Sequence, residues 1–198
     1  MTSRPPVTTT SDRKTAKGFL PRLARDTRGL SAVEFALLAP VLITMYFGIA
    51  EVGQAFMAQK RQAHVASMVA DLVAQTDVVT VDGMEDVFAA GALVIKPFAA
   101  TNLTVRVTSV TRDSKGVDRV VWSRGSGIAP RGTDSVVSGP AIPAGMIANG
   151  ESLVMSETSY NYISPVKRFI PAPMVFKGAF FLLPRRVSVV GCSDCPRT

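Results

Sequence analysis

An apolar segment near the N-terminus constrains this chain more than any other feature. No charged residue occurs from Phe35 to Ala50, and the apolar segment that contains this stretch runs from Leu30 to Val52. As an α-helix, at about 1.5 Å per residue, it would be roughly 35 Å long, and the hydrocarbon core of a bilayer is about 30 Å thick. The sequence therefore predicts a single transmembrane helix over about residues 30–53.

The positive charge of the chain is concentrated on one side of this segment. The net charge is +7, and residues 1–28 carry seven basic and two acidic residues, or +5. Short basic flanks are retained on the cytoplasmic side of a membrane. We therefore expect residues 1–29 to be a basic cytoplasmic leader and the C-terminal part to lie across the membrane. Because topology explains most of the excess charge, we expect no nucleic-acid partner.

The helical pattern continues beyond the apolar segment. Residues 54–76 contain no Gly or Pro and are rich in Ala, the strongest helix former. Polar residues recur at three- and four-residue steps, while Val65, Val69 and Leu72 line another face. The polar stripe consists of Lys60, His64, Ser67, Asp71 and Gln75. We predict one helix over residues 30–76, kinked or locally opened at Pro40.

Residues 77–198 are predicted to form an α+β domain. Asp82 followed by Glu85 resembles an N-terminal capping box for a short helix that ends near Ile95. Strand patterns follow at 103–108, 117–123, 151–162 and 180–190, with a turn at 113–116 and a long irregular segment at 125–150. The predicted fold class is α+β, with the long N-terminal helix packed on a small antiparallel sheet.

A carboxylate stands within the start of the apolar segment. Glu34 belongs to the sequence Arg28-Gly-Leu-Ser-Ala-Val-Glu-Phe35. On insertion scales a charged side chain costs about 2.5 to 3.5 kcal/mol near the centre of a membrane helix, and less near its end. Glu34 therefore either reaches the cytoplasmic surface or pairs with a partner inside the membrane.

The basic leader, Gly29, a glutamate as the fifth residue after it and an adjacent aromatic residue together resemble the processing site of type IV prepilins. The segment from Gly29 to Pro40 is similar to the N-terminus of TadE-like pseudopilins of the bacterial tight-adherence (Tad, Flp pilus) machinery. The resemblance implies a pilin-like fold and cleavage by a prepilin peptidase between Gly29 and Leu30. It also implies that Glu34, beside Phe35, pairs with the freed amino group of Leu30 or of a neighbouring subunit.

The resemblance further implies a minor pseudopilin and not an enzyme, processed by the peptidase and supporting pilus biogenesis and surface adhesion. The implied partners are the prepilin peptidase, other pilins or pseudopilins, the pilus assembly platform and membrane lipid, with no small-molecule substrate and no cofactor. The implied location is the bacterial inner membrane, crossed once, with a cytoplasmic N-terminus and a periplasmic C-terminal domain that an extracellular pilus could incorporate.

Two other readings stay open. One is an unprocessed, membrane-anchored periplasmic scaffold of the TadG-like type, which has the same topology. A secreted enzyme with a removable signal peptide is less favoured, because no small-x-small cleavage site follows the apolar segment.

The two cysteines, Cys192 and Cys195, have a spacing that fits a disulfide, a redox dithiol or half a zinc site. No helix follows to lower a thiol pKa, because Pro196 and two further residues complete the sequence. A zinc site needs two more ligands, and His64 is the only histidine. We expect a structural disulfide, no metal site, and a solvated or interface position for His64.

Overall fold

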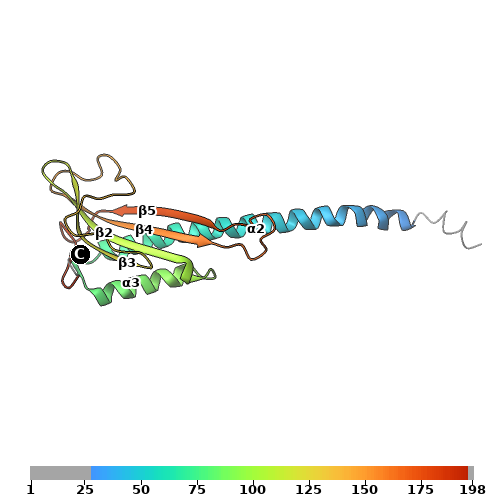
Figure 1. The fold of residues 1–198 in the computed structure, drawn as a ribbon, viewed down its shortest axis with the longest axis horizontal. Helices are drawn as coiled ribbons and strands as arrows, with labels where there is room; N and C mark the ends of the chain where they lie inside the picture. Colours follow the sequence, from blue (N-terminus) through green and yellow to red (C-terminus); the bar gives the residue numbers. More distant parts are fainter. Residues whose placement is uncertain (1–27, 196–198) are drawn as a thin grey trace, which may run out of the picture. The chain divides into compact units, whose positions relative to one another are not determined.

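The computed structural model describes residues 28–195, and for Arg28 the backbone alone. Nearly all of the predicted leader, residues 1–29, therefore lies outside the described residues. Figure 1 shows the order of the elements along the chain. These are α2 (Arg28–Ala74), β1 (Val78–Val79), α3 (Val81–Val94), the 3₁₀ helix η2 (Ala100–Asn102), β2 (Leu103–Arg112), β3 (Asp118–Ser126), β4 (Ser152–Tyr162), β5 (Met174–Leu182) and β6 (Gly191–Cys192).

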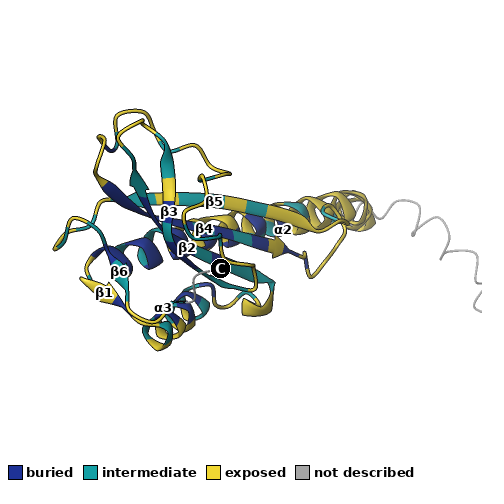
Figure 2. Ribbon diagram, turned by 60° about the vertical axis from the view of Figure 1, so that its left-hand side comes forward, coloured by how far each residue is buried: buried dark blue, intermediate teal, exposed yellow. Residues whose placement is uncertain are grey.

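The structure divides at Phe47/Gly48 into two compact units. Within the described residues, the first unit is the N-terminal part of α2, and its side chains are exposed almost throughout (Figure 2). The second unit, from Gly48 onward, holds every other element together with the rest of α2. We call it the outer unit.

The predicted long helix is confirmed as α2, which remains helical through Pro40. In the outer unit, Val65, Val69 and Val73 are fully buried along one face. The assignment of Leu72 to this face was wrong, because its side chain is 38% exposed. Steps of four residues from Val65 follow the helical period, and Leu72 falls beside that row instead of on it.

Helix α3 begins differently from the prediction. Its N-cap is Thr80, whose side-chain oxygen accepts a hydrogen bond from the Gly83 N–H at 3.0 Å, and Asp82 lies in the first turn. Thr in the extended conformation at this position satisfies an amide that the helix leaves unpaired. On the inner face of α3, Gly91 approaches α2 closely: a Cβ there would lie 3.2 Å from Val65 Cγ1.

The main sheet has four antiparallel strands in the order β3-β2-β4-β5. The predicted turn at 113–116 joins β2 to β3. The backbone N–H groups of Lys115 and Val117 donate hydrogen bonds to Asp113 Oδ1 and close it. The α+β fold class, with a long helix packed on a small antiparallel sheet, is therefore confirmed.

The prediction was wrong for the last strands. The fourth strand of the sheet is Met174–Leu182, and residues 183–190 contain no strand. Lys177 and Gly178 interrupt the alternation of apolar residues in β5, so the sequence pattern did not indicate a strand that begins at Met174. A two-residue parallel pairing of β1 with β6 was not predicted, because such short strands have no sequence pattern.

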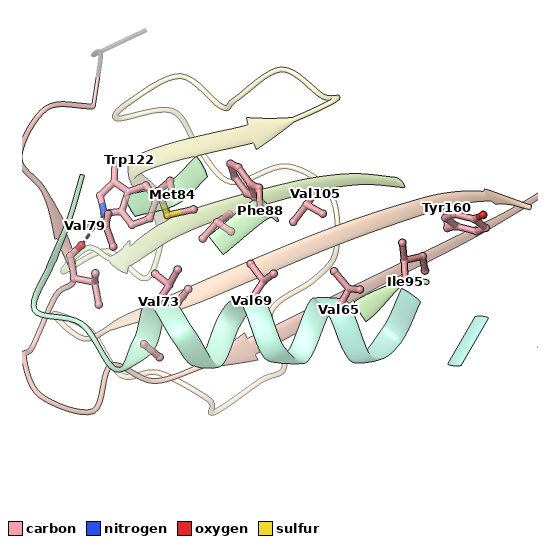
Figure 3. Packing of buried hydrophobic residues seen from close by; sticks show 14 of the residues in the cluster. Val65, Val69, Val73, Val79, Met84, Phe88, Ile95, Val105, Trp122 and Tyr160 are labelled. Carbon is pink, nitrogen blue, oxygen red and sulfur yellow. Dashed lines mark hydrogen bonds between the residues drawn. The ribbon is translucent and has the colours of Figure 1, made fainter. Parts of the chain in front are cut away.

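Hydrophobic cores lie on both faces of the sheet. On one face, α2 and α3 pack against it, and Figure 3 shows Val65, Val69 and Val73 projecting from the helix toward the sheet. Trp122 belongs to this core, and its indole N–H donates to the Val190 carbonyl at 2.7 Å. A smaller core on the other face lies under the irregular segment 127–151. It consists of Val110, Ile147, Leu153 and Met155.

Candidate functional site

The predicted processing motif lies at the first turns of α2. Gly29, Leu30, Glu34 and Phe35 are all helical and exposed, with Leu30 at 60% and Phe35 at 69%. A Cβ at Gly29 would meet nothing within 4 Å. The described fold therefore gives no steric reason for a glycine at this position.

Glu34 has no hydrogen-bond or ion-pair partner among residues 28–195. It is exposed and lies one helical turn after Leu30, so both residues are on the same face of α2. An amino group at the start of a helix that began at Leu30 would be within reach of this carboxylate. Within the described chain, however, the charge is uncompensated.

The surface of α2 around this motif is apolar on all sides. Leu37, Val41 and Ile43 are 72%, 64% and 56% exposed, and the other large side chains of the first unit are similar. Of the described helices, one is long and apolar enough to cross a membrane, over Gly29–Ala74, and its most apolar window is not buried by other parts of the chain. This helix is consistent with a membrane anchor.

A second carboxylate, Glu51, bounds the uncharged segment at its other end and was missed in the sequence. Its side chain is 1% exposed. The Ser164 hydroxyl donates to Glu51 Oε1, the Phe169 N–H donates to Oε2 at 2.8 Å, and the Ile170 N–H donates to Oε1 at 3.3 Å. The charge is thus satisfied by the β4–β5 connection of the outer unit.

The β4–β5 connection also covers the helix beside Glu51. The Phe169 ring lies over Gly48, where a Cβ would be 3.4 Å from the ring. One signal in the sequence could have indicated Glu51: an acidic residue at the far end of an apolar segment. Its partners, however, lie more than 110 residues later.

Glu34 and Glu51 therefore differ in their hydrogen-bond partners. Both flank the same uncharged segment of α2, yet Glu51 is fully bonded inside the fold and Glu34 has no partner in the described chain. Burying a carboxylate in an apolar environment requires a partner. If the first unit of α2 lies in lipid, Glu34 must either reach the membrane surface or find a partner outside the described residues.

The cysteine pair lies where the chain returns to α3. Cys192 and Cys195 are joined by a disulfide with a Cα–Cα distance of 5.6 Å. Between them, Asp194 Oδ1 accepts a hydrogen bond from the Val81 N–H at 2.9 Å, at the first residue of α3. The bonded loop thus holds a carboxylate at a helix N-terminus, where negative charge is favourable.

The other titratable groups weighed in the sequence form no cluster. His64 is exposed on α2, and its carbonyl accepts a hydrogen bond from the Ser67 hydroxyl. Among the described residues no group of three or more His, Cys, Asp or Glu is arranged to hold a metal ion.

Comparison with known proteins gives one family match, to the model described as TadE-like protein, over residues 29–71. No curated protein and no solved structure matches the chain. The match begins at Gly29 and covers the motif and the apolar segment together with most of the rest of α2. Over residues 29–71, the chain is therefore similar to the TadE-like family, as the sequence motif predicts.

Proposed function

We propose that this protein is a minor pseudopilin of a Tad/Flp-type pilus assembly system, processed by a prepilin peptidase and supporting pilus biogenesis and surface adhesion. The TadE-like match supports involvement in such pilus systems in general. The observation that carries the finer proposal is Glu34, a carboxylate without a partner among residues 28–195, at the start of the apolar and exposed first part of α2.

Cleavage between Gly29 and Leu30 would supply the missing partner. It places an ammonium group one turn before Glu34, either on the same helix or on a neighbouring one, and the two charges neutralise each other when helices bundle. The helix N-terminus itself also favours a negative charge nearby. Glu34 would then set the axial register of one subunit against the next, while Phe35 lies next to it on the exposed helix surface.

The proposal also explains Gly29. The structure has open space around it, so a side chain there would be tolerated by the fold, and glycine is the weakest helix former apart from proline. A scissile bond must leave the helix and enter the protease cleft in an extended form. Glycine makes that unwinding easier and leaves no side chain in the way.

The proposed location is the bacterial inner membrane, with the basic leader in the cytoplasm and the outer unit in the periplasm. The charge asymmetry of residues 1–28 supports this orientation. The proposed partners are the prepilin peptidase, other pilins or pseudopilins, the assembly platform and membrane lipid. We propose a role in assembly and not an enzymatic activity, as the resemblance to TadE-like pseudopilins implies.

The alternative function is an unprocessed, TadG-like scaffold that stays in the bilayer. The hydrogen bonds to Glu51 favour it, because they hold the β4–β5 connection on α2 within the outer unit, as a permanent scaffold would require. The scaffold requires neither cleavage after Gly29 nor a role for Glu34 in assembly, so these two features separate the proposals.

Substitution of Glu34 tests the assembly role directly. Glu34→Ala and Glu34→Gln should insert in the membrane and be cleaved, yet fail to support pili, because the ammonium group of a neighbouring subunit has no carboxylate to bind. Thr44→Ala is the matched control: Thr44 lies on the same exposed helix and bonds only to the Pro40 carbonyl of its own turn, at 2.7 Å. Electron microscopy of surface pili is the readout, and normal piliation of both Glu34 variants would reject the proposed role.

A further inference from the structure

The connection between β4 and β5 has an unusual surface. We call residues 163–170 the interface loop. Its apolar side chains are close to half exposed, with Ile163 and Val166 at 45% and Phe169 at 46%. Lys167 and Arg168 stand exposed between them. Apolar side chains interleaved with cations are typical of protein surfaces that meet the headgroup region of a membrane.

The interface loop is held in one conformation by α2. Glu51 accepts hydrogen bonds from Ser164, Phe169 and Ile170, and the Lys167 N–H donates to the Ser164 hydroxyl at 3.3 Å. Lys167 itself has a left-handed backbone, with φ of 56°. A non-glycine residue keeps this conformation only where its surroundings fix it. The interface loop therefore has a fixed conformation and is attached to α2 at Glu51.

The point of attachment, Glu51, lies at the end of the apolar segment. Glu51 lies 21 positions after Leu30, which corresponds to about 32 Å of helix, against a hydrocarbon thickness of about 30 Å. If Leu30 lies at one boundary of the membrane, Glu51 lies at the other. Within the outer unit, the β4–β5 connection lies beside α2, to which its bonds to Glu51 attach it (Figure 1).

We propose that the interface loop binds the anionic phospholipid surface of the bilayer that α2 crosses. Phe169 and Val166 enter the boundary between headgroups and acyl chains, and Lys167 and Arg168 bind lipid phosphates. The inference rests on the membrane anchoring in the proposed function. It goes beyond it in assigning a lipid-binding surface to the outer unit, which thereby lies on the membrane in a fixed orientation until the helix is extracted.

Two observations favour lipid over another occupant. The cations of the loop match the negative charge of phosphate headgroups, and the loop is continuous, through Phe169 on Gly48 and the bonds to Glu51, with the lipid-facing end of α2. A second copy of the chain would instead have to accommodate Lys167 and Arg168 against an outer unit that is itself basic, with 15 basic and 12 acidic residues from Gly48 onward.

The native disulfide makes a single-site probe practical. Cys192 and Cys195 are bonded to each other, so an introduced cysteine in the unreduced chain is the one free thiol among the described residues. An environment-sensitive fluorophore is attached at Val166→Cys in the loop. Val136→Cys, 58% exposed in the irregular segment, is the negative control, and Ile43→Cys, 56% exposed in the apolar segment, is the positive control.

The full chain is reconstituted in lipid nanodiscs that contain shallow spin-labelled lipid as a quencher, with phosphatidylcholine alone or mixed with phosphatidylglycerol. We expect the probe at 166 to be blue-shifted and quenched, more strongly with phosphatidylglycerol, and the probe at 136 to remain unquenched. Replacement of both cations (Lys167→Gln with Arg168→Gln) should lower the ratio of bound to free loop by about fivefold for each charge in anionic discs.

The controls separate this inference from the anchoring on which it rests. Quenching at 43 without quenching at 166 would overturn the loop proposal and leave the membrane anchor intact. Absence of quenching at both sites would overturn the anchor itself. A blue shift at 166 without quenching by lipid would mean that protein covers the loop, which also rejects the proposal.

Discussion

The close approach of α2 to β5 makes a quantitative prediction about Gly178. A Cβ at this position would lie 2.7 Å from Gln62 Nε2. Gln62 is 2% exposed, and its amide donates to the Thr158 hydroxyl and, at 3.3 Å, to the Thr158 carbonyl. The methyl group of Gly178→Ala must therefore displace a hydrogen-bonded amide in a buried site.

The expected cost follows from these contacts. A buried donor left unpaired costs about 1 to 3 kcal/mol, while replacing Gly by Ala in a strand regains about 0.5 to 1 kcal/mol of backbone entropy. Gly178→Ala should thus lower the free energy of unfolding by up to about 2.5 kcal/mol, with about 1 kcal/mol at the middle of the range that those two effects set. In a Gln62→Ala background the clash is gone, and the same substitution should be neutral or stabilising by up to about 1 kcal/mol.

Urea unfolding of the full chain in detergent, followed by tryptophan fluorescence, measures this double-mutant cycle. Trp122 is the only tryptophan and is 4% exposed in the core of the outer unit, so its emission reports this unit alone. Gly53→Ala is the control that measures the gain in stability from replacing Gly by Ala without a clash, since a Cβ at Gly53 meets nothing within 4 Å. A coupling free energy within about 0.5 kcal/mol of zero would refute the reasoning.

Two further predictions concern the edges of the outer unit. Replacing both cysteines (Cys192→Ser with Cys195→Ser) should lower the free energy of unfolding by about 1 to 2 kcal/mol, since so short a loop restricts the unfolded chain only modestly; an unchanged urea midpoint would show that the loop needs no bond to hold Asp194. The pKa of Asp113 lies below its ordinary value of 3.8, first because the Val117 N–H donates to its carboxylate and then because of Arg119, although partial burial opposes both. A lowered pKa contributes stability above pH 3.8 that is lost as the pH falls through the folded value. The stability difference between the native chain and Asp113→Asn should therefore shrink in acid, and a difference independent of pH would contradict this.

The long helix and most of the sheet could be predicted because their signals are local. Ala-rich sequence without Gly or Pro over residues 54–76 specifies the second half of α2, and alternation around an Asp-to-Gly turn specifies β2 and β3. The prediction failed at β5 because of a contact with a distant part of the chain. Gly178 weakens the strand pattern, yet the structure needs it there because the Gln62 amide occupies the space of a side chain.

The candidate site was predictable only in part, for a similar reason. Gly29, Glu34 and Phe35 stand close together in sequence, and their combination is distinctive. Glu51 is comparable in charge and position, but its role depends on Ser164 and Phe169, which the fold brings to it from a connection 113 and 118 residues later. No local pattern contains that information.

The bond after Gly29 offers a matched pair of variants. Gly29 and Gly53 both lie in α2 with open space around them, so Leu at either position should leave the fold intact and strengthen the helix by up to about 1 kcal/mol. Gly29→Leu should prevent processing, because its side chain must enter the peptidase cleft and its helix is harder to unwind. Gly53→Leu should be processed normally, and equal processing of both variants would remove Gly29 from the proposed recognition.

The most direct test of the pseudopilin account is the N-terminal residue of the protein taken from its native membrane. Mass spectrometry of the intact chain, from cells with and without the host's prepilin peptidase, determines it in one comparison. The account predicts a chain that starts at Leu30 when the peptidase is present and retains residues 1–29 when it is absent. A chain that starts at Met1 or Thr2 in both cells would contradict it and favour the anchored scaffold.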